Sequence, residues 1–466
     1  MKWSKDHVSD IRIAYIGGGS KAWAWKLMAD LALEPSLDGT IALYDIDEKA
    51  AEENAIIGNQ LKERKECLGH WDYEVAKSLP EALMGADFVI ISILPGTFEE
   101  MRSDVHLPER LGIYQSVGDT AGPGGMIRAL RTLPMYAEIA GAIKAYAPDA
   151  WVISYTNPMS LCVKSLYDTY PEIKAFGCCH EVFGTQKVLA AIAKQALHTD
   201  AIDRSEIKVN VLGINHFTWF DEASYQNIDL FPIYRDYIEK NFKEGWDDPD
   251  RPWEASTFNC RHRVKFDLFN RFGYIAAAGD RHLAEFLPGD TYLKDPETVK
   301  SWMFGLTTVD FRIQQMNERL ARRRRLIAGE EKLDIAPSGE EGVLLIKALV
   351  GLDRVVSNVN IPNTGLQITN LPADAVVETN AVFSRDSIKP ILAGTLSEEL
   401  REMMMPHIEN HAAILEASKT CNKELVVQSF LRDPLVKAKC TDEAQIRSLV
   451  DDMIRNTSGY LPEGWK

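Results

Sequence analysis

Apolar runs alternate with helical patterns through the first part of the chain. Residues 11–16, 41–44, 88–93 and 151–155 are short, largely apolar runs, so each is a candidate for a buried strand. The segments between them have helical spacing and many good helix formers. Nearly continuous apolar strands that alternate with helices are typical of a parallel sheet covered on both faces. We therefore predict an α/β fold, a Rossmann-like doubly wound parallel sheet, over residues 1–200.

The pattern becomes mixed after a further apolar run at residues 207–214. Residues 357–383 combine apolar runs with turn signals, and residues 397–457 again have helical spacing. An acidic stretch that contains proline, residues 329–342, is expected to be an exposed connection. We predict that residues 201–466 form one α+β domain.

Composition narrows the possible partners. The chain has 466 residues, with 52 Lys+Arg against 68 Asp+Glu and a net charge of −16 at pH 7. Nucleic acid and anionic membranes bind through Lys and Arg, so this acidity argues against both. The longest uncharged apolar stretch, residues 88–98, is far short of the roughly 20 residues that a membrane-spanning helix needs. Seven cysteines without paired spacing, and a charged N-terminal stretch, favour a cytoplasmic protein.

A glycine-rich loop follows the first predicted strand and opens a helix. Residues 17–22, Gly-Gly-Gly-Ser-Lys-Ala, fit the pattern G-x-G-x-x-A, in which glycine lets backbone N–H groups approach a pyrophosphate. Asp45 ends the second strand at a suitable distance to bind a ribose diol, which favours NAD, although Asp47 is an alternative. A tight strand–helix turn without a ligand would share the glycine pattern. The candidate cofactor-binding residues are Gly17, Gly19, Ser20, Ala22, Asp45, Ser92 and Asn157.

Polar residues with metal-binding or catalytic chemistry follow later strands. Residues 177–182, Gly-Cys-Cys-His-Glu-Val, come after one predicted strand, and His216 ends another. The carboxyl ends of parallel strands form the ligand crevice of such sheets, so a thiolate and an imidazole there could hold a divalent ion. Buried structural thiols and a hydrogen-bonded core histidine are the alternative interpretation. Asn157, before Pro158, is either a ligand contact or a turn residue.

Residues 279–282, Gly-Asp-Arg-His, place a carboxylate and two possible cations within one turn. Asp280 is therefore a candidate base, or a cap at a helix N-terminus.

These motifs, in this order, resemble glycoside hydrolase family 4, whose members are NAD- and Mn²⁺-dependent glycosidases. The four residues from Cys179 to Val182, Cys-His-Glu-Val, are similar to the α-galacturonidase subgroup of that family. The matching segments are residues 17–22, 44–47, 118–125, 156–158, 179–180, 213–216, 359–363 and 370–372, with Arg102 and Asp104.

The resemblance implies a role for each candidate residue. Cys179 and His216 would bind the metal, His180 would assist the leaving oxygen, and Asp280, or alternatively Tyr274, would be the base. It further implies that residues 201–466 resemble the C-terminal domain of lactate and malate dehydrogenases, carry the substrate and metal sites, and support a homodimer or homotetramer. The candidate substrate contacts are Asn157, Glu181, Arg281, His282, Arg102 and Asp119.

The activity implied by the resemblance is hydrolysis of α-galacturonides by oxidation, elimination, addition and reduction. NAD⁺ takes hydride from C3 of the sugar, the base removes the C2 proton, the C1–O bond breaks, water adds, and hydride is returned. An α-glucosidase, α-galactosidase or α-glucuronidase of the same family is the alternative within the family. An NAD-dependent hydroxy-acid or polyol dehydrogenase, or a cofactor sensor, is the alternative in another class.

Overall fold

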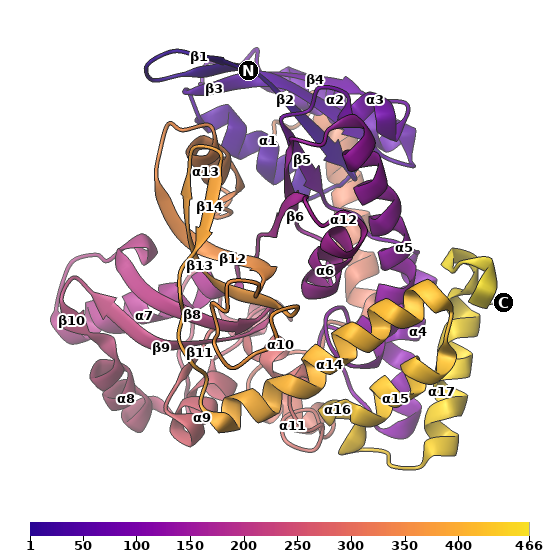
Figure 1. The fold of residues 1–466 in the computed structure, drawn as a ribbon. Helices are drawn as coiled ribbons and strands as arrows, with labels where there is room; N and C mark the ends of the chain where they lie inside the picture. Colours follow the sequence, from indigo (N-terminus) through magenta and orange to yellow (C-terminus); the bar gives the residue numbers. More distant parts are fainter. Residues whose placement is uncertain (466) are drawn as a thin grey trace.

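The strands predicted in the first part of the chain form the centre of a ten-stranded sheet (Figure 1). The computed structural model describes residues 1–465. Six strands run parallel in the order β4-β3-β2-β5-β6-β7, which confirms the predicted Rossmann-like arrangement. They are β2 (Val8–Ile16), β3 (Leu37–Tyr44), β4 (His70–Val75), β5 (Phe88–Ile91), β6 (Trp151–Ser154) and β7 (Lys174–Gly177).

Helices cover both faces of this sheet, as nearly continuous apolar strands require. One buried cluster joins one face to α1 (Trp23–Leu33) and α2 (Glu48–Leu61). Another joins the opposite face to α3 (Leu79–Leu83), α5 (Gly122–Tyr146) and α6 (Met159–Thr169).

Three later strands extend the same sheet. Residues 357–383 were predicted to contain strands of the second domain, and here β12 (Val355–Pro362) follows β7 in the strand order. β13 (Val376–Ser384) and β14 (Ser387–Pro390) continue the sheet in antiparallel pairing. The core on the α1 face also includes residues from α13 (Gly342–Leu349), β12 and β13. The division of the chain at residue 200 stays a prediction.

A second, smaller sheet and further helices make up most of the remaining structure. A four-stranded antiparallel sheet contains β8 (Ile207–Ile214), β9 (Phe217–Tyr225), β10 (Ile228–Asp229) and β11 (Ile275–Ala276). Its neighbouring helices are α7 (Glu181–Leu197), α8 (Leu230–Asn241), α9 (Arg263–Phe272) and α10 (Asp280–Glu285). β1 (Lys2–Trp3) pairs with β2 and is the tenth strand of the large sheet. The other helices are α4 (Phe98–His106), α11 (Pro296–Ser301), α12 (Val309–Ile327), α14 (Glu398–Thr420), α15 (Lys423–Arg432), α16 (Pro434–Lys437) and α17 (Glu443–Thr457).

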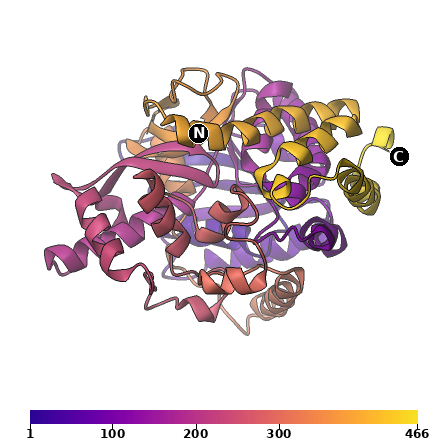
Figure 2. The same ribbon diagram turned by 90° about the horizontal axis from the view of Figure 1, so that it is seen from below.

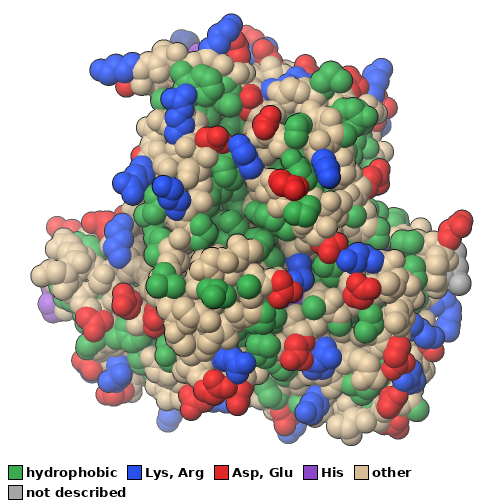
Figure 3. All heavy atoms as spheres, viewed as in Figure 1, with side chains coloured by type: hydrophobic (Ala, Val, Ile, Leu, Met, Phe, Trp, Pro, Cys, Tyr) green, Lys and Arg blue, Asp and Glu red, His purple; other side chains and the backbone are tan. Residues whose placement is uncertain are grey.

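The C-terminal helices α14 to α17 lie together at one side of the molecule, next to α5, in both ribbon views (Figures 1 and 2). Among residues 1–465, none of the helices combines the length and apolarity needed to cross a membrane. On the face shown in Figure 3, acidic and basic side chains are interspersed, so the net charge is not gathered there into one patch.

Candidate active site

The glycine-rich loop sits where the first strand meets the first helix. Gly17 has a φ of +93°, and a Cβ added to it would lie 2.1 Å from the carbonyl oxygen of Ser92. Only glycine allows this approach of the loop to the end of β5. The N–H of Gly19 donates to Asp45 Oδ2 at 2.8 Å, so Asp45 lies directly against the loop. Asp47, the alternative, instead caps α2 by accepting from the N–H of Ala50 at 3.2 Å.

The other predicted cofactor residues lie within this loop or after a later strand. Ser20 Oγ accepts from the N–H of Trp23 at 3.2 Å, and Ala22 precedes α1 without contributing a side-chain cap. The carbonyl of Asn157 accepts from Arg128 Nε at 3.1 Å. The side-chain oxygen of Asn157 is buried and has no hydrogen-bond partner among the described residues. An orphaned buried amide oxygen is costly, so this atom suits contact with a ligand.

Three side chains form the centre of the site. Donor atoms of Asp119, His216 and His282 all lie within 4.8 Å of one another, and the two imidazole rings are 4.0 Å apart. His216 was predicted as a metal ligand, whereas His282 and Asp119 were predicted as substrate contacts. Carboxylate and imidazole donors at this spacing suit a divalent transition metal. The structure therefore adds two possible metal donors beside His216.

Thr120 orients His216. The Thr120 hydroxyl donates to Asp119 Oδ1 at 2.8 Å, and its oxygen lies 3.0 Å from His216 Nδ1. Because the hydroxyl proton is used by Asp119, the oxygen accepts from Nδ1–H. This arrangement leaves the Nε2 lone pair of a neutral His216 free for a metal. Burial lowers the pKa of His216, which also favours the neutral ring.

Cys179 follows β7 and is buried, but it does not belong to the group of three donors. Its thiol lies beside Asn215 and Glu378, and burial raises its pKa well above the ordinary value. Burial also raises the pKa of Glu378, to about 7. A bound cation would favour the thiolate, so metal binding and deprotonation are coupled here. The pairing of Cys179 with His216 as metal ligands stays a prediction.

Glu181, two residues after Cys179, contacts the segment of residues 279–282. Its Oε2 accepts from the N–H of Gly279 at 2.8 Å, and its Oε1 lies 3.5 Å from His282 Nε2. Burial alone would raise the pKa of Glu181, but the imidazoles of His282 and His180 hold it well below its usual range. The carboxylate is therefore ionised and faces the centre of the site.

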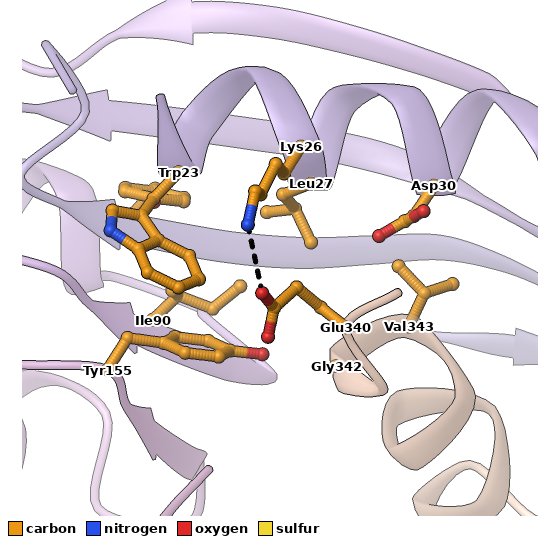
Figure 4. Close-up of a pocket in the computed structure, with 10 residues that line it drawn as sticks. Trp23, Lys26, Leu27, Asp30, Ile90, Tyr155, Glu340, Gly342 and Val343 are labelled. Carbon is orange, nitrogen blue, oxygen red and sulfur yellow. Dashed lines mark hydrogen bonds and ion pairs between the residues drawn. The ribbon is translucent and has the colours of Figure 1, made fainter. Parts of the chain in front are cut away.

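His180 lies on the α1 side of the site, where its ring is 5.9 Å from that of Trp23. Its Nδ1 is 3.4 Å from Glu340 Oε1, and the same oxygen accepts from Lys26 Nζ at 3.0 Å (Figure 4). The side chain of Glu340 is only 9% exposed. Residues 329–342 were expected to be an exposed connection, and this expectation is wrong for Glu340, because Lys26 and His180 give its carboxylate two partners.

Asp280 adopts a different capping role from the one considered. It accepts from the N–H groups of Val264 at 3.1 Å and Lys265 at 3.3 Å, and so caps α9, whereas Gly279 precedes its own helix. Burial raises the pKa of Asp280 to about 6. Tyr274, the second candidate base, is half-buried and packs against a buried cluster that joins α5, β8 and β9 to the C-terminal helices. The choice of base stays a prediction.

Arginines supply the positive charge of the site. Arg281 lies 4.6 Å from the ring centroid of Phe258 and donates to Thr307 Oγ1 at 3.3 Å. Burial alone would raise the pKa of Asp119, but Arg128 and Arg312 help to hold it well below its usual range. Sequence reasoning missed both arginines; Arg128 follows the 118–125 motif by less than one helical turn, whereas nothing in the sequence marks Arg312.

Arg102 does not join this group. It lies at the surface of α4, where it forms a 2.7 Å ion pair with Asp310 of α12. Its charge is thus already paired at an exposed position, and its role as a substrate contact stays a prediction.

The parallel sheet with its glycine-rich loop, together with this group of donors, is what the comparison with known families bears on. The chain belongs to the family 4 glycosyl hydrolases: the family model matches residues 12–195, and the model of the family's C-terminal domain matches residues 211–436. The predicted family is thereby confirmed.

Individual relatives add detail. An α-galacturonidase of Lachnoclostridium phytofermentans is 63% identical over 465 residues, covering 100% of both chains. An α-galactosidase of Bacillus subtilis is 31% identical over 455 residues, covering 97% of this chain and 99% of its own. A 6-phospho-α-glucosidase from gut microorganisms, solved in complex with NAD and Mn²⁺, shares the fold at 20% identity with a TM-score of 0.79, covering 97% of this chain and 99% of its own.

Proposed function

We propose that this protein is an α-galacturonidase that hydrolyses short α-galacturonides and requires NAD⁺ and a divalent metal, Mn²⁺ by preference. The observation that carries the proposal is the group of Asp119, His216 and His282, in which Thr120 leaves a neutral imidazole nitrogen free for a metal. The 63% identity to an α-galacturonidase, against 31% to an α-galactosidase, supports the choice of sugar.

The residues of this chain fit both NAD and a divalent metal. The Gly17–Ala22 loop and Asp45 would hold NAD, while His216 and Cys179, with His282 or Asp119, would hold the metal. Bound NAD⁺ supplies a reversible hydride acceptor and bound Mn²⁺ supplies a Lewis acid.

The residues around the metal donors would handle the protons. Asp280 would accept the C2 proton of the sugar, a role that suits a carboxylate whose pKa burial raises to about 6. His180, held between Glu340 and Glu181, would donate to the leaving oxygen. The amide oxygen of Asn157, which has no partner among the described residues, would bind the sugar or the nicotinamide.

Recognition of the galacturonide carboxylate is proposed to fall to Arg281. A guanidinium binds a carboxylate through two parallel hydrogen bonds. Within residues 1–465, the guanidinium of Arg281 donates a single hydrogen bond, to Thr307. Arg128 and Arg312 add positive charge on the Asp119 side. These local cations offset a chain whose net charge is −16 and which would otherwise repel an anionic sugar.

A panel of p-nitrophenyl α-glycosides tests the proposal. We expect cleavage of the galacturonide only when NAD⁺, Mn²⁺ and a thiol reductant are all present, with no net formation of NADH. Cleavage that persists after complete removal of NAD⁺ would contradict the mechanism. Net NADH release without cleavage would establish a dehydrogenase instead. Preferred cleavage of the galactoside, glucoside or glucuronide would keep the family and change the substrate.

The location and assembly are also proposals. All seven cysteines are free thiols in the structure, which suits a reducing cytoplasm. A homodimer or homotetramer is proposed from the family resemblance, and light scattering on a sizing column would measure it.

A further inference from the structure

Glu378 is a buried carboxylate behind the metal donors. It lies on β13 and is 1% exposed, yet its hydrogen-bond partners are amides rather than cations. Asn358 Nδ2 donates to its Oε1 at 2.6 Å, and Asn215 Nδ2 donates to its Oε2 at 3.2 Å. Burying a carboxylate without a cationic partner is costly, so the position of Glu378 points to a role beyond filling the core.

Both asparagines are attached to turns that carry the proposed metal ligands, one through a hydrogen bond and the other through the backbone. Asn358 Nδ2 also donates to the carbonyl oxygen of Cys179 at 3.0 Å. Asn215 directly precedes His216, whose φ of +65° is in the left-handed region. A non-glycine residue keeps that conformation only where its surroundings hold it.

These two turns belong to different sheets. Cys179 follows β7 in the ten-stranded sheet, and His216 follows β8 in the four-stranded sheet. A single side chain, that of Glu378, bonds to the amide behind each turn. It therefore connects the two sheets at the point where their metal ligands must meet.

We propose that Glu378 is a positioning residue for the metal site, which fixes Cys179 relative to His216 through Asn358 and Asn215. This inference rests on the proposed metal site, and it assigns Glu378 a role that acts through Asn358 and Asn215. Loss of an outer partner of metal ligands weakens metal binding by about 10- to 100-fold.

The test compares Glu378→Leu with Glu378→Gln. Leucine removes both hydrogen bonds, whereas glutamine removes the charge but can still bond to both asparagines once one amide flips. In Mn²⁺ titrations followed by electron paramagnetic resonance at mildly alkaline pH, we expect Glu378→Leu to lose about 10- to 100-fold in affinity. Glu378→Gln should recover most of that loss. With Co²⁺ in place of Mn²⁺, the thiolate-to-metal absorption from Cys179 should weaken in the leucine variant.

Two controls and one alternative variant separate a specific effect on the metal site from a general loss of structure. Thr379→Val, the next residue of the same strand, removes a buried hydroxyl that has no partner among residues 1–465, and it should leave Mn²⁺ affinity unchanged. NAD⁺ affinity should stay unchanged in every variant. If Glu378→Leu fails to fold, Asn358→Leu tests the Cys179 side alone and should also weaken Mn²⁺ binding.

Equal losses in the glutamine and leucine variants would show an effect of charge and overturn the positioning role. Unchanged Mn²⁺ affinity, or parallel loss of NAD⁺ binding, would overturn it as well. A wild-type protein that binds no Mn²⁺ would instead contradict the proposed function itself.

Discussion

At the scale of single residues, the ability of the site to bind a metal depends on which atoms carry the protons in its hydrogen bonds. One hydroxyl proton, that of Thr120, serves Asp119 and thereby determines which nitrogen of His216 carries hydrogen. Two histidines side by side are compatible with a metal because burial lowers the pKa values of His216 and His282. The negative charge of Asp119 is then offset by two arginines, Arg128 and Arg312.

Replacement of Arg281 by alanine tests the carboxylate contact. A charge-assisted hydrogen bond contributes about 1.5–3 kcal/mol, so we expect kcat/KM on an α-galacturonide to fall by about 10- to 100-fold. The loss of kcat/KM on a neutral α-galactoside should be much smaller. On the α-galacturonide, the kcat/KM of Arg281→Lys should lie between those of wild type and Arg281→Ala. Equal losses on both sugars would reject Arg281 as the carboxylate contact.

Sequence reasoning identified most of the reactive groups at this scale but few of their partners. Asp119, His216 and His282 were all named, and the structure brings them together. The groups that orient them, such as Thr120 and Glu378, were missed because their contacts join segments far apart in the sequence. Arg102 was named for its place in a motif, and its exposed pairing with Asp310 could not be read from a motif.

At the scale of elements, the turn from β2 into α1 is tightly constrained. It combines a left-handed glycine with a loop amide bonded to Asp45. This geometry was predicted well because glycine spacing reports directly on backbone requirements.

Gly17→Ala should abolish measurable NAD⁺ binding and lower the thermal midpoint of unfolding. The added Cβ would meet the Ser92 carbonyl at 2.1 Å, and the φ of +93° is strained for alanine. Calorimetric titration of NAD⁺ measures the effect. Gly141→Ala is the matched control, because its Cβ would meet nothing within 4 Å inside helix α5, and it should be neutral or slightly stabilising. Normal NAD⁺ binding by Gly17→Ala would contradict the proposed role of the loop.

The start of α16 makes stability depend on pH. Asp433 caps this helix through the N–H groups of Leu435 and Val436, and burial raises its pKa to about 7. Between its ordinary pKa and this value, the folded state holds a proton that the unfolded state has released. Its contribution to stability is therefore full at low pH and is lost as pH rises toward 7.

Asp433→Asn keeps the capping oxygen and removes the titration. We expect the unfolding free energy of the variant, relative to wild type, to rise by about 4 kcal/mol as pH increases through this window. Urea unfolding at a series of pH values measures the difference. A difference that does not change with pH would show that Asp433 titrates normally in the fold.

At the scale of the whole molecule, the two halves of the chain share a core. The cluster on the α1 face contains Val8 and Phe176 together with Leu345 and Phe383. The sequence predicted both the parallel sheet and strands within residues 357–383. It could not show that these strands join the first sheet, because strand periodicity reports burial and not the identity of the neighbouring strand.

A fragment of residues 1–200 tests whether the first part of the chain needs the shared core in order to fold. It lacks β12 to β14 and α13, so β7 would become an open edge and the α1 face would lose its later contacts. We expect the fragment to be aggregation-prone and to lack a cooperative unfolding transition, as judged by sizing chromatography and calorimetry. A soluble, cooperative fragment that binds NAD⁺ would instead establish residues 1–200 as an independent domain.

The place of β12 and β13 beside β7 also has a consequence for synthesis. Gly177 ends β7, but the antiparallel strands that extend the sheet beyond it are complete only at Pro390, the last residue of β14. At about 5–20 residues per second, translation of the intervening segment takes roughly 10–40 seconds. During that interval the nascent chain presents an uncovered strand edge and an unfinished apolar face. Newly made chains should therefore depend on chaperones until the C-terminal half has left the ribosome.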